Sequence, residues 1–190
     1  MLENEEIIDQ FKKSLSATVK SIGKSQDIEI NFVDKESSIN GTKINLINPD
    51  ISSVINNLYY IRAEADTMAL EIRLHDPKIH SKYVSSNNIA NEIFNVIEKS
   101  RIDAKGSNIF KGIKSNIFKK HNVDINNKKD EKKFLIDAFK YVSYCELTKQ
   151  SLKGEYNNYK KFLKQKLGKN YNYYFEDLRK NINNQKKFCW

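Results

Sequence analysis

The residues of this chain whose types and spacing could do chemistry gather in one stretch, RAEADTMALEIRLHDPKIHSKY, which spans residues 62–83. It holds two of the three histidines of the chain. His75 and Asp76 are adjacent, and His80 follows four residues after Asp76. Imidazole and carboxylate groups spaced in this way can bind a metal ion or exchange protons. The stretch therefore has two interpretations, a catalytic metal site and the polar side of a structural helix.

The pair His75-Asp76 resembles the metal-binding pair of the HD phosphohydrolases, which also use a histidine upstream and an aspartate downstream. No histidine precedes His75, so one ligand of that site is missing. Asp76 and His80 alone provide two ligands, which is too few for zinc. We favour a structural interpretation in which Asp76 caps a helix that begins at Pro77 and orients His80. A metal-dependent hydrolase built on His75, Asp76 and His80 stays open as an alternative.

Arginine is scarce in this chain, because nearly all of the positive charge comes from lysine. Arg62 and Asp66 are four residues apart, and Glu98 and Arg101 are three apart, which are the spacings of ion pairs on one helix face. Arg101 also has Asp103 nearby. Arginine can hold a carboxylate by two parallel hydrogen bonds, unlike lysine. The arginines that we consider candidates for specific carboxylate contacts are Arg62, Arg73 and Arg101. We predict that Arg62, Asp66, Glu98 and Arg101 join the two central helices or bind a partner.

The elements that must position these residues are mostly helices, because apolar residues recur at intervals of three and four. One pattern covers residues 7–22 and ends at Gly23. A long stripe covers residues 51–72, with Asp50 or Ser52 as its cap and Pro77 as its stop. Asn87 or Asn88 opens the next helix. Later in the chain, Gly106 and Gly112 are expected to mark the boundaries of a short helix. The segment HNVDINNKKD (residues 121–130) is expected to be a polar connection. The remaining predicted helices cover residues 134–145, 156–167 and 173–188.

Two short segments alternate between apolar and polar residues, which predicts strands. They are DIEINFV (residues 27–33) and TKINLI (residues 42–47), and Asn40-Gly41 between them is a favoured turn pair. We therefore expect a hairpin near residues 28–47 with a broad loop. The predicted fold class is mainly α with a small β-hairpin (α+β), in a single domain over residues 1–190.

The composition and the short motifs of the chain limit the kinds of partner and of site that it can have. The net charge is +9, and lysine accumulates after Lys105, which favours a polyanionic partner, although enrichment in Lys and Asn also follows from AT-rich coding. No apolar run is long enough for a transmembrane helix. Cys145 and Cys189 stand far apart, which suggests free thiols in a reducing cytoplasm. No glycine-rich phosphate loop and no Cys/His cluster is present in the sequence. The last apolar pattern has no stop signal before Trp190, so we expect further chain after it.

The central block resembles the amino-terminal region of the CobT family, a subunit of aerobic cobaltochelatase. The first resemblance is the motif Arg62-x-x-Ala65-Asp66-x-Met68-Ala69-Leu70 with His75-Asp76 and His80. The second is ANEIFNVIEKSRIDAKGSN, in which the matching residues are Ala90, Ile93, Phe94, Glu98, Arg101, Ala104 and Gly106. The segments FKKSLSATVKSI and FEDLRKNINNQKKF are also similar to the family. The positions that depart from its pattern are Ala63, Glu64, Ser100 and Asp103.

The resemblance implies a non-catalytic subunit of the complex that inserts cobalt into hydrogenobyrinic acid a,c-diamide. Its partners would be an AAA+ motor subunit and a large corrin-binding subunit in the cytoplasm. The complex would use ATP, Mg²⁺ and cobalt, and this chain would bind no cofactor. The family continues through an acidic linker into a von Willebrand factor A domain, neither of which this sequence contains. The motif residues would then fix helix geometry or meet a partner. The alternative is a small basic nucleic-acid-binding helical domain, without a recognisable nucleic-acid module.

Overall fold

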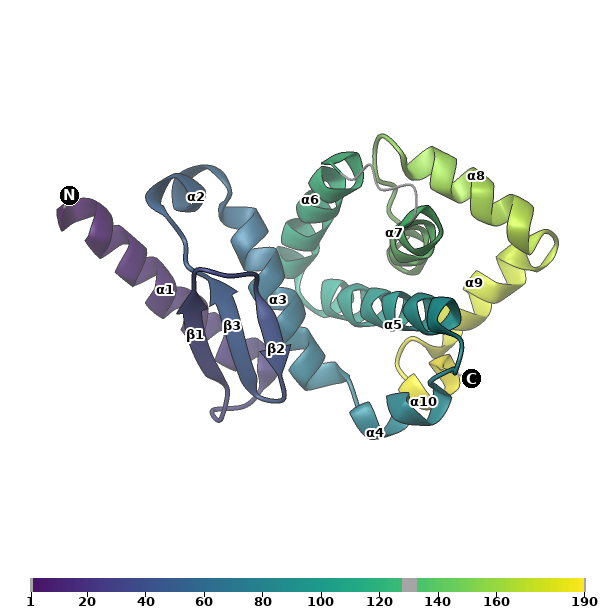
Figure 1. The fold of residues 1–190 in the computed structure, drawn as a ribbon, viewed down its shortest axis with the longest axis horizontal. Coiled ribbons are helices and arrows are strands. Elements are labelled where there is room, and N and C mark those ends of the chain that lie inside the picture. The colour runs from purple at the N-terminus through teal and green to yellow at the C-terminus, as the bar shows by residue number, and fades with distance from the viewer. Residues whose placement is uncertain (1, 128–132, 190) are drawn as a thin grey trace.

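The computed structural model describes residues 2–127 and 133–189, in which a small sheet lies with the first helices at one end and the later helices form a second group at the other (Figure 1). In the amino-terminal part, helix α1 (Leu2–Gly23) packs against helix α3 (Leu58–Leu74), and strand β3 (Lys43–Ile47) contacts α3 as well. Leu15 and Val19 of α1 are buried because they recur every four residues and face this core. The predicted fold class, mainly α with a small β part, is confirmed.

The sheet has three strands in the order β1-β3-β2, where β1 is Glu29–Val33 and β2 is Ser38–Asn40. β1 pairs with β3 in parallel, and only β2 pairs with β3 as an antiparallel hairpin. The expected pairing of the two alternating segments as one hairpin is therefore wrong. The turn at Asn40-Gly41 does form, with Gly41 at φ +59°, but it connects β3 to the short strand β2. A strand with one apolar residue, Ile39, was too short to give an alternation signal.

The long stripe of residues 51–72 folds as two helices, α2 (Ile51–Asn56) and α3, with a break at Asn57. Asp50 is the cap of α2, because its side chain accepts a hydrogen bond from the backbone N–H of Ser53 at 2.7 Å. Helix α3 ends at Leu74, and Pro77 begins the next short helix, α4 (Pro77–His80). A 3₁₀ turn (Ser81–Tyr83) follows. The positions of the cap and of the stop agree with the sequence, whereas the break does not follow from the apolar spacing.

Helix α5 (Asn88–Ile109) is capped by Asn87 and continues through Gly106. The expectation that Gly106 bounds a helix is therefore wrong. A Cβ at this position would collide with the buried side chain of Leu70 on α3, so the glycine permits close packing of two helices. Helix α6 (Lys111–Asn127) likewise extends through residues 121–127, which were expected to be a connection. The rest of that segment, residues 128–130, lies outside the described residues.

Helix α7 (Phe134–Thr148) lies at the centre of the second part, where α5, α6, α8 and α9 pack around it (Figure 1). Helices α8 (Tyr156–Leu167) and α9 (Asn170–Asn181) bury one face each. The pattern of residues 173–188 is interrupted, because α9 ends at Asn181 and α10 (Gln185–Phe188) starts anew with Asn184 as its cap.

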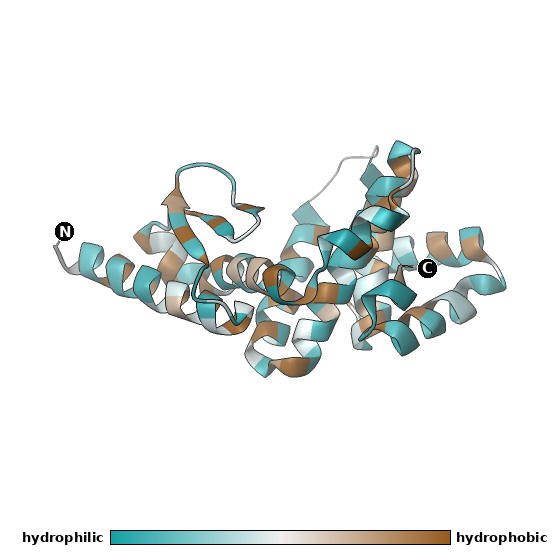
Figure 2. Ribbon diagram, turned by 90° about the horizontal axis from the view of Figure 1, so that it is seen from below, coloured by the Kyte–Doolittle hydropathy of each residue, from teal (hydrophilic) through white to brown (hydrophobic). Residues whose placement is uncertain are grey.

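Cys145 and Cys189 are free thiols. Within the described residues, no helix is both long and apolar enough to span a membrane. Figure 2 shows the hydrophilic residues along these helices.

Candidate functional site

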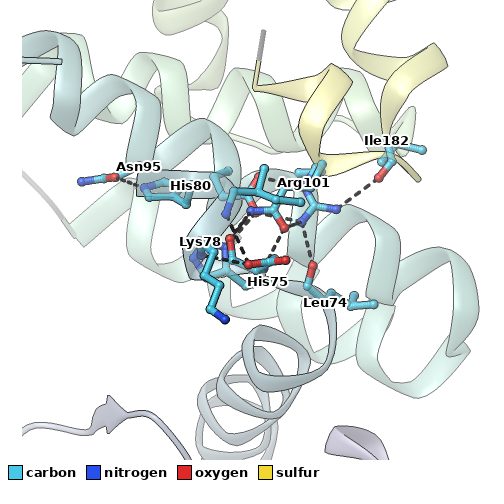
Figure 3. A network of polar contacts seen from close by, with 11 residues as sticks. Leu74, His75, Lys78, His80, Asn95, Arg101 and Ile182 are labelled. Atoms are coloured by element: carbon cyan, nitrogen blue, oxygen red, sulfur yellow. Dashed lines mark hydrogen bonds and ion pairs between the residues drawn. The ribbon is translucent and has the colours of Figure 1, made fainter. Parts of the chain in front are cut away.

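Arg101 of α5 is the centre of a buried polar network that joins three parts of the chain (Figure 3). Its Nε and Nη2 donate to the two carboxylate oxygens of Glu98, both at 2.7 Å. Nη2 also donates to the backbone oxygen of Leu74 at 2.9 Å, and Nη1 to that of Ile182 at 3.3 Å. The Arg101 side chain is 1% exposed and that of Glu98 is 3% exposed. A charged pair taken this far out of water is held by the hydrogen bonds that complete it.

His75 and Gln185 extend this network across the ends of α3 and α10. His75 Nδ1 lies 3.0 Å from the Oε1 atom of Glu98, and a carboxylate only accepts, so the ring donates there. Gln185 accepts from the backbone N–H of Asp76 at 2.8 Å and donates to its carbonyl oxygen at 3.0 Å. The carboxy-terminal helix is thus bonded to the turn between α3 and α4, 109 residues earlier.

Asp76 acts locally, as the sequence indicated. Its Oδ1 accepts hydrogen bonds from the backbone N–H groups of Lys78 and Ile79, at 2.8 and 3.2 Å, and so caps α4. The backbone N–H of His80 donates to the carbonyl oxygen of Asp76 at 3.0 Å, but within the described residues no hydrogen bond joins the two side chains, so the expectation that Asp76 orients the His80 ring is wrong. His80 is instead oriented by helix α5, because its Nε2 lies 2.9 Å from Asn95 Oδ1 and its ring stacks on Phe94 at 4.4 Å between centroids.

Asp66 and Arg62 lie farther along α3 and do not form the predicted ion pair in the described part of the chain. Asp66 is buried and its Oδ2 accepts a hydrogen bond from Asn116 of α6 at 3.0 Å. Burial raises the pKa of the Asp66 carboxyl to about 6, although the bond from Asn116 and the charge of Arg62 act in the opposite direction. Arg62 itself is exposed. Arg73, by contrast, donates to the backbone oxygen of Ile22 at 3.1 Å and lies over the Phe110 ring.

A second buried polar cluster was missed by reasoning from sequence. Asp103 does not pair with Arg101 but accepts from Thr67 at 3.0 Å and faces His121, with 3.6 Å between Oδ2 and Nε2. The His121 ring packs edge-on against Tyr144, 4.5 Å between centroids, and burial lowers its pKa, so the ring is neutral at pH 7. The spacing of Ile117, His121 and Ile125 on one helix face was the signal that could have found it.

The geometry suits these residues to holding helices together. The centroids of the His75 and His80 rings lie 4.9 Å apart. One nitrogen of each ring faces a protein partner, because His75 Nδ1 lies beside Glu98 and His80 Nε2 lies beside Asn95. Across residues 2–127 and 133–189, no three His, Cys, Asp or Glu side chains are grouped so that they could share a metal ion. The site is therefore a set of internal contacts between α3, α4, α5 and α10.

The metal interpretation yields a direct prediction. Elemental analysis of the purified chain by mass spectrometry is expected to find no stoichiometric zinc, manganese or iron, because the described residues contain no group of three His, Cys, Asp or Glu side chains that could share a metal ion, and one nitrogen of each imidazole already faces a protein partner. The matched control is His80→Ala, which should show the same trace metal content as the unmodified chain. A metal bound at one equivalent in the unmodified chain and lost in His80→Ala would contradict this.

The fold and the site together define a helical domain whose charged motif residues bind its own elements to one another. This chain belongs to the CobT family: the family model described as cobalamin biosynthesis protein CobT matches residues 5–189, nearly the whole chain. The resemblance found in the motif around Arg62, His75 and Arg101 is thereby confirmed. No solved structure matched the chain. Membership in this family supports a role in cobalamin biosynthesis.

Proposed function

We propose that this chain is a non-catalytic subunit of the cobaltochelatase complex and docks on its AAA+ motor subunit. In this proposal the complex inserts cobalt into hydrogenobyrinic acid a,c-diamide in the cytoplasm during aerobic cobalamin biosynthesis. The large subunit holds the corrin, the motor subunit hydrolyses ATP with Mg²⁺, and this chain couples the two without binding a cofactor. The proposal extends the family match over residues 5–189, which is the observation that carries it.

The state of the motif residues supports a scaffold more than an enzyme. Glu98 and Arg101 are buried in a pair whose hydrogen bonds are directed inward, and Asp66 is buried against Asn116. A general acid or base has to reach a substrate proton at hydrogen-bond distance. Residues enclosed in this way can instead give the domain a defined shape for a partner to bind. The sequence has no phosphate-binding loop of the P-loop type, so ATP hydrolysis is assigned to the motor subunit.

The surface that faces solvent near the carboxy-terminal helices is strongly basic. We call it the basic surface, and its exposed residues are Lys149, Lys153, Lys161, Lys164, Lys166, Lys169, Lys180, Lys186 and Lys187. The same part of the chain, residues 149–188, contains only three acidic residues, Glu155, Glu176 and Asp177. Exposed charges of one sign steer an oppositely charged partner and are screened by salt. Docking on an acidic face of the motor subunit would therefore weaken as ionic strength rises.

The experiment is co-elution of this chain with the motor subunit on a sizing column at low and at high salt. We expect a complex at low salt that weakens at high salt, and no ATPase or chelatase activity from this chain alone. A variant with Lys161, Lys164 and Lys169 changed to Gln should bind less tightly, because these lysines are exposed on the basic surface.

The matched control changes Lys24, Lys35 and Lys99 to Gln, which removes the same charge from exposed positions elsewhere. It should bind like the unmodified chain at low salt. No association with the motor subunit at either salt concentration, together with tight salt-dependent binding to random RNA, would replace the docking proposal by the nucleic-acid alternative.

A further inference from the structure

A groove with a volume of about 800 Å³ lies between α1, α3 and the junction of α5 with α6. Its apolar lining residues come from elements far apart in the sequence and are Phe11, Leu15, Ile22, Ile109, Phe110 and Ile113. Ile109 is 47% exposed there, an unusual state for a large aliphatic side chain next to a buried core. A hydrophobic hollow of this kind at the surface is a site where another apolar side chain can be buried.

One wall of the groove is an exposed face of α1 made of small side chains. Ser14, Ala17, Thr18 and Ser21 all line it, and their spacing of three and four residues places them on one side of the helix. The Thr18 hydroxyl donates to the backbone oxygen of Ser14 at 2.8 Å, so this polar group is already satisfied within α1. Small side chains at such spacing let a second helix approach closely. From Phe11 to Ile22 the wall is about 17 Å long, or about three helical turns.

Arg62 lines the same groove. It differs from the other arginines because it forms no ion pair or hydrogen bond with the described residues. The other three are occupied: Arg73 by Ile22, Arg101 by Glu98, and Arg179 by Glu146 at 3.6 Å. Lys111 is a second cation on the rim, and it is exposed. The acid in the groove, Asp66, is buried and bonded to Asn116. The rim therefore carries an excess of positive charge with an exposed guanidinium that can hold a carboxylate through two hydrogen bonds.

We propose that this groove receives an amphipathic helix of the motor subunit, about three turns long, whose apolar stripe covers the groove floor and whose Asp or Glu side chain pairs with Arg62. The inference rests on the proposed function for the identity of the partner, while the groove itself defines the chemistry of the helix. The hydrophobic floor provides contact area, and the ion pair sets the register and direction of the helix.

Two substitutions test the groove without disturbing the core. A side chain at Gly112 meets no other atom within 4 Å of its Cβ, so Gly112→Trp can obstruct the groove, and replacing glycine in a helix favours helix formation. Arg62→Gln removes the cation from an exposed side chain. The matched controls are Glu92→Trp and Lys99→Gln, at exposed positions of α5 that do not line the groove. Circular dichroism and melting temperature verify that all four variants fold.

The affinity of each variant for the motor subunit is then measured by titration calorimetry. Both groove variants are expected to bind at least tenfold more weakly than the unmodified chain, and both controls within about twofold. Binding that survives both groove variants would overturn the groove as the docking site and leave docking itself intact. A complex absent even with the unmodified chain would instead overturn the proposed function.

A second probe keeps the groove testable without the motor subunit. It is a designed 14-residue helix-stabilised peptide with leucine at four positions spaced i, i+3, i+4 and i+7 and a single Glu, compared with the same peptide carrying Gln. The unmodified chain should bind the Glu peptide about fivefold more tightly, and Arg62→Gln should bind the two equally. Equal binding by the unmodified chain, or no binding, would overturn the groove proposal. A dimer of this chain that Gly112→Trp dissociates would overturn it in favour of a second copy.

Discussion

Replacement of Arg101 by methionine is expected to lower the free energy of unfolding by about 3–5 kcal/mol. The side chain is 1% exposed and holds both oxygens of Glu98 as well as the backbone oxygens of Leu74 and Ile182. Methionine has a similar length but cannot donate, so Glu98 would remain buried as an uncompensated charge. Urea denaturation followed by circular dichroism measures the change.

The matched control is Arg62→Met, which removes the same group from an exposed position of α3. It should change the free energy of unfolding by no more than about 0.5 kcal/mol. The double change Glu98→Leu with Arg101→Met should recover part of the loss, because no buried charge is then left. A loss from Arg101→Met below about 1 kcal/mol would show that the pair behaves like one on the surface.

The destabilisation caused by Arg101→Met should be concentrated near α10. Arg101 contacts the residues around α10 through Ile182 and Gln185, and Gln185 in turn bonds to Asp76. Hydrogen exchange of the backbone amides in residues 185–188 should therefore accelerate in Arg101→Met before that of α7 does, because α10 has few other partners. Uniform acceleration over the whole chain would contradict this assignment.

Replacement of Asp66 by asparagine is expected to stabilise the protein at pH 7.5, with an upper limit of about 3 kcal/mol. The pKa of the folded-state carboxyl is raised from 3.8 to about 6. Between these two values the folded state binds more protons than the unfolded state, so stability falls as pH rises and the full cost is present above pH 6. Asparagine has the same shape, can still accept from Asn116, and carries no charge to desolvate.

The informative measurement is the difference in free energy of unfolding between Asp66→Asn and the unmodified chain from pH 4 to pH 8. This difference should be smallest near pH 4, grow up to pH 6–7 and stay constant above, which isolates Asp66 from other titrating groups. Asp27→Asn is the control, since Asp27 is exposed. A difference that shrinks as pH rises would mean that the folded-state pKa of Asp66 is lowered.

The sequence alone determined the features that depend on neighbours within a few residues. A capping side chain reaches only the next two or three backbone N–H groups, so the sequence indicated Asp76 as a cap and limited two other caps to neighbouring candidates, of which Asp50 and Asn87 form the bonds. The same holds for the Glu98–Arg101 pair, whose members are one helical turn apart. Spaced identities in the motif around Arg62 and Arg101 were also enough to indicate the family, which the match over residues 5–189 confirmed.

The tertiary structure decided everything that depends on contacts between distant segments. β1 pairs in parallel with one edge of β3 and the short strand β2 pairs with the other edge, and apolar alternation does not encode which strands become neighbours. Gly106 lies inside a helix because Leu70 of another helix occupies the space of its absent side chain. Asp66 bonds to Asn116, 50 residues away, instead of to Arg62 on its own helix, and Arg101 reaches Gln185, 84 residues away. Spacing in the sequence predicts only the partners that lie on the same helix face. A buried charge is costly without a hydrogen-bond partner, so it bonds to whichever polar group the packed helices bring within hydrogen-bond distance.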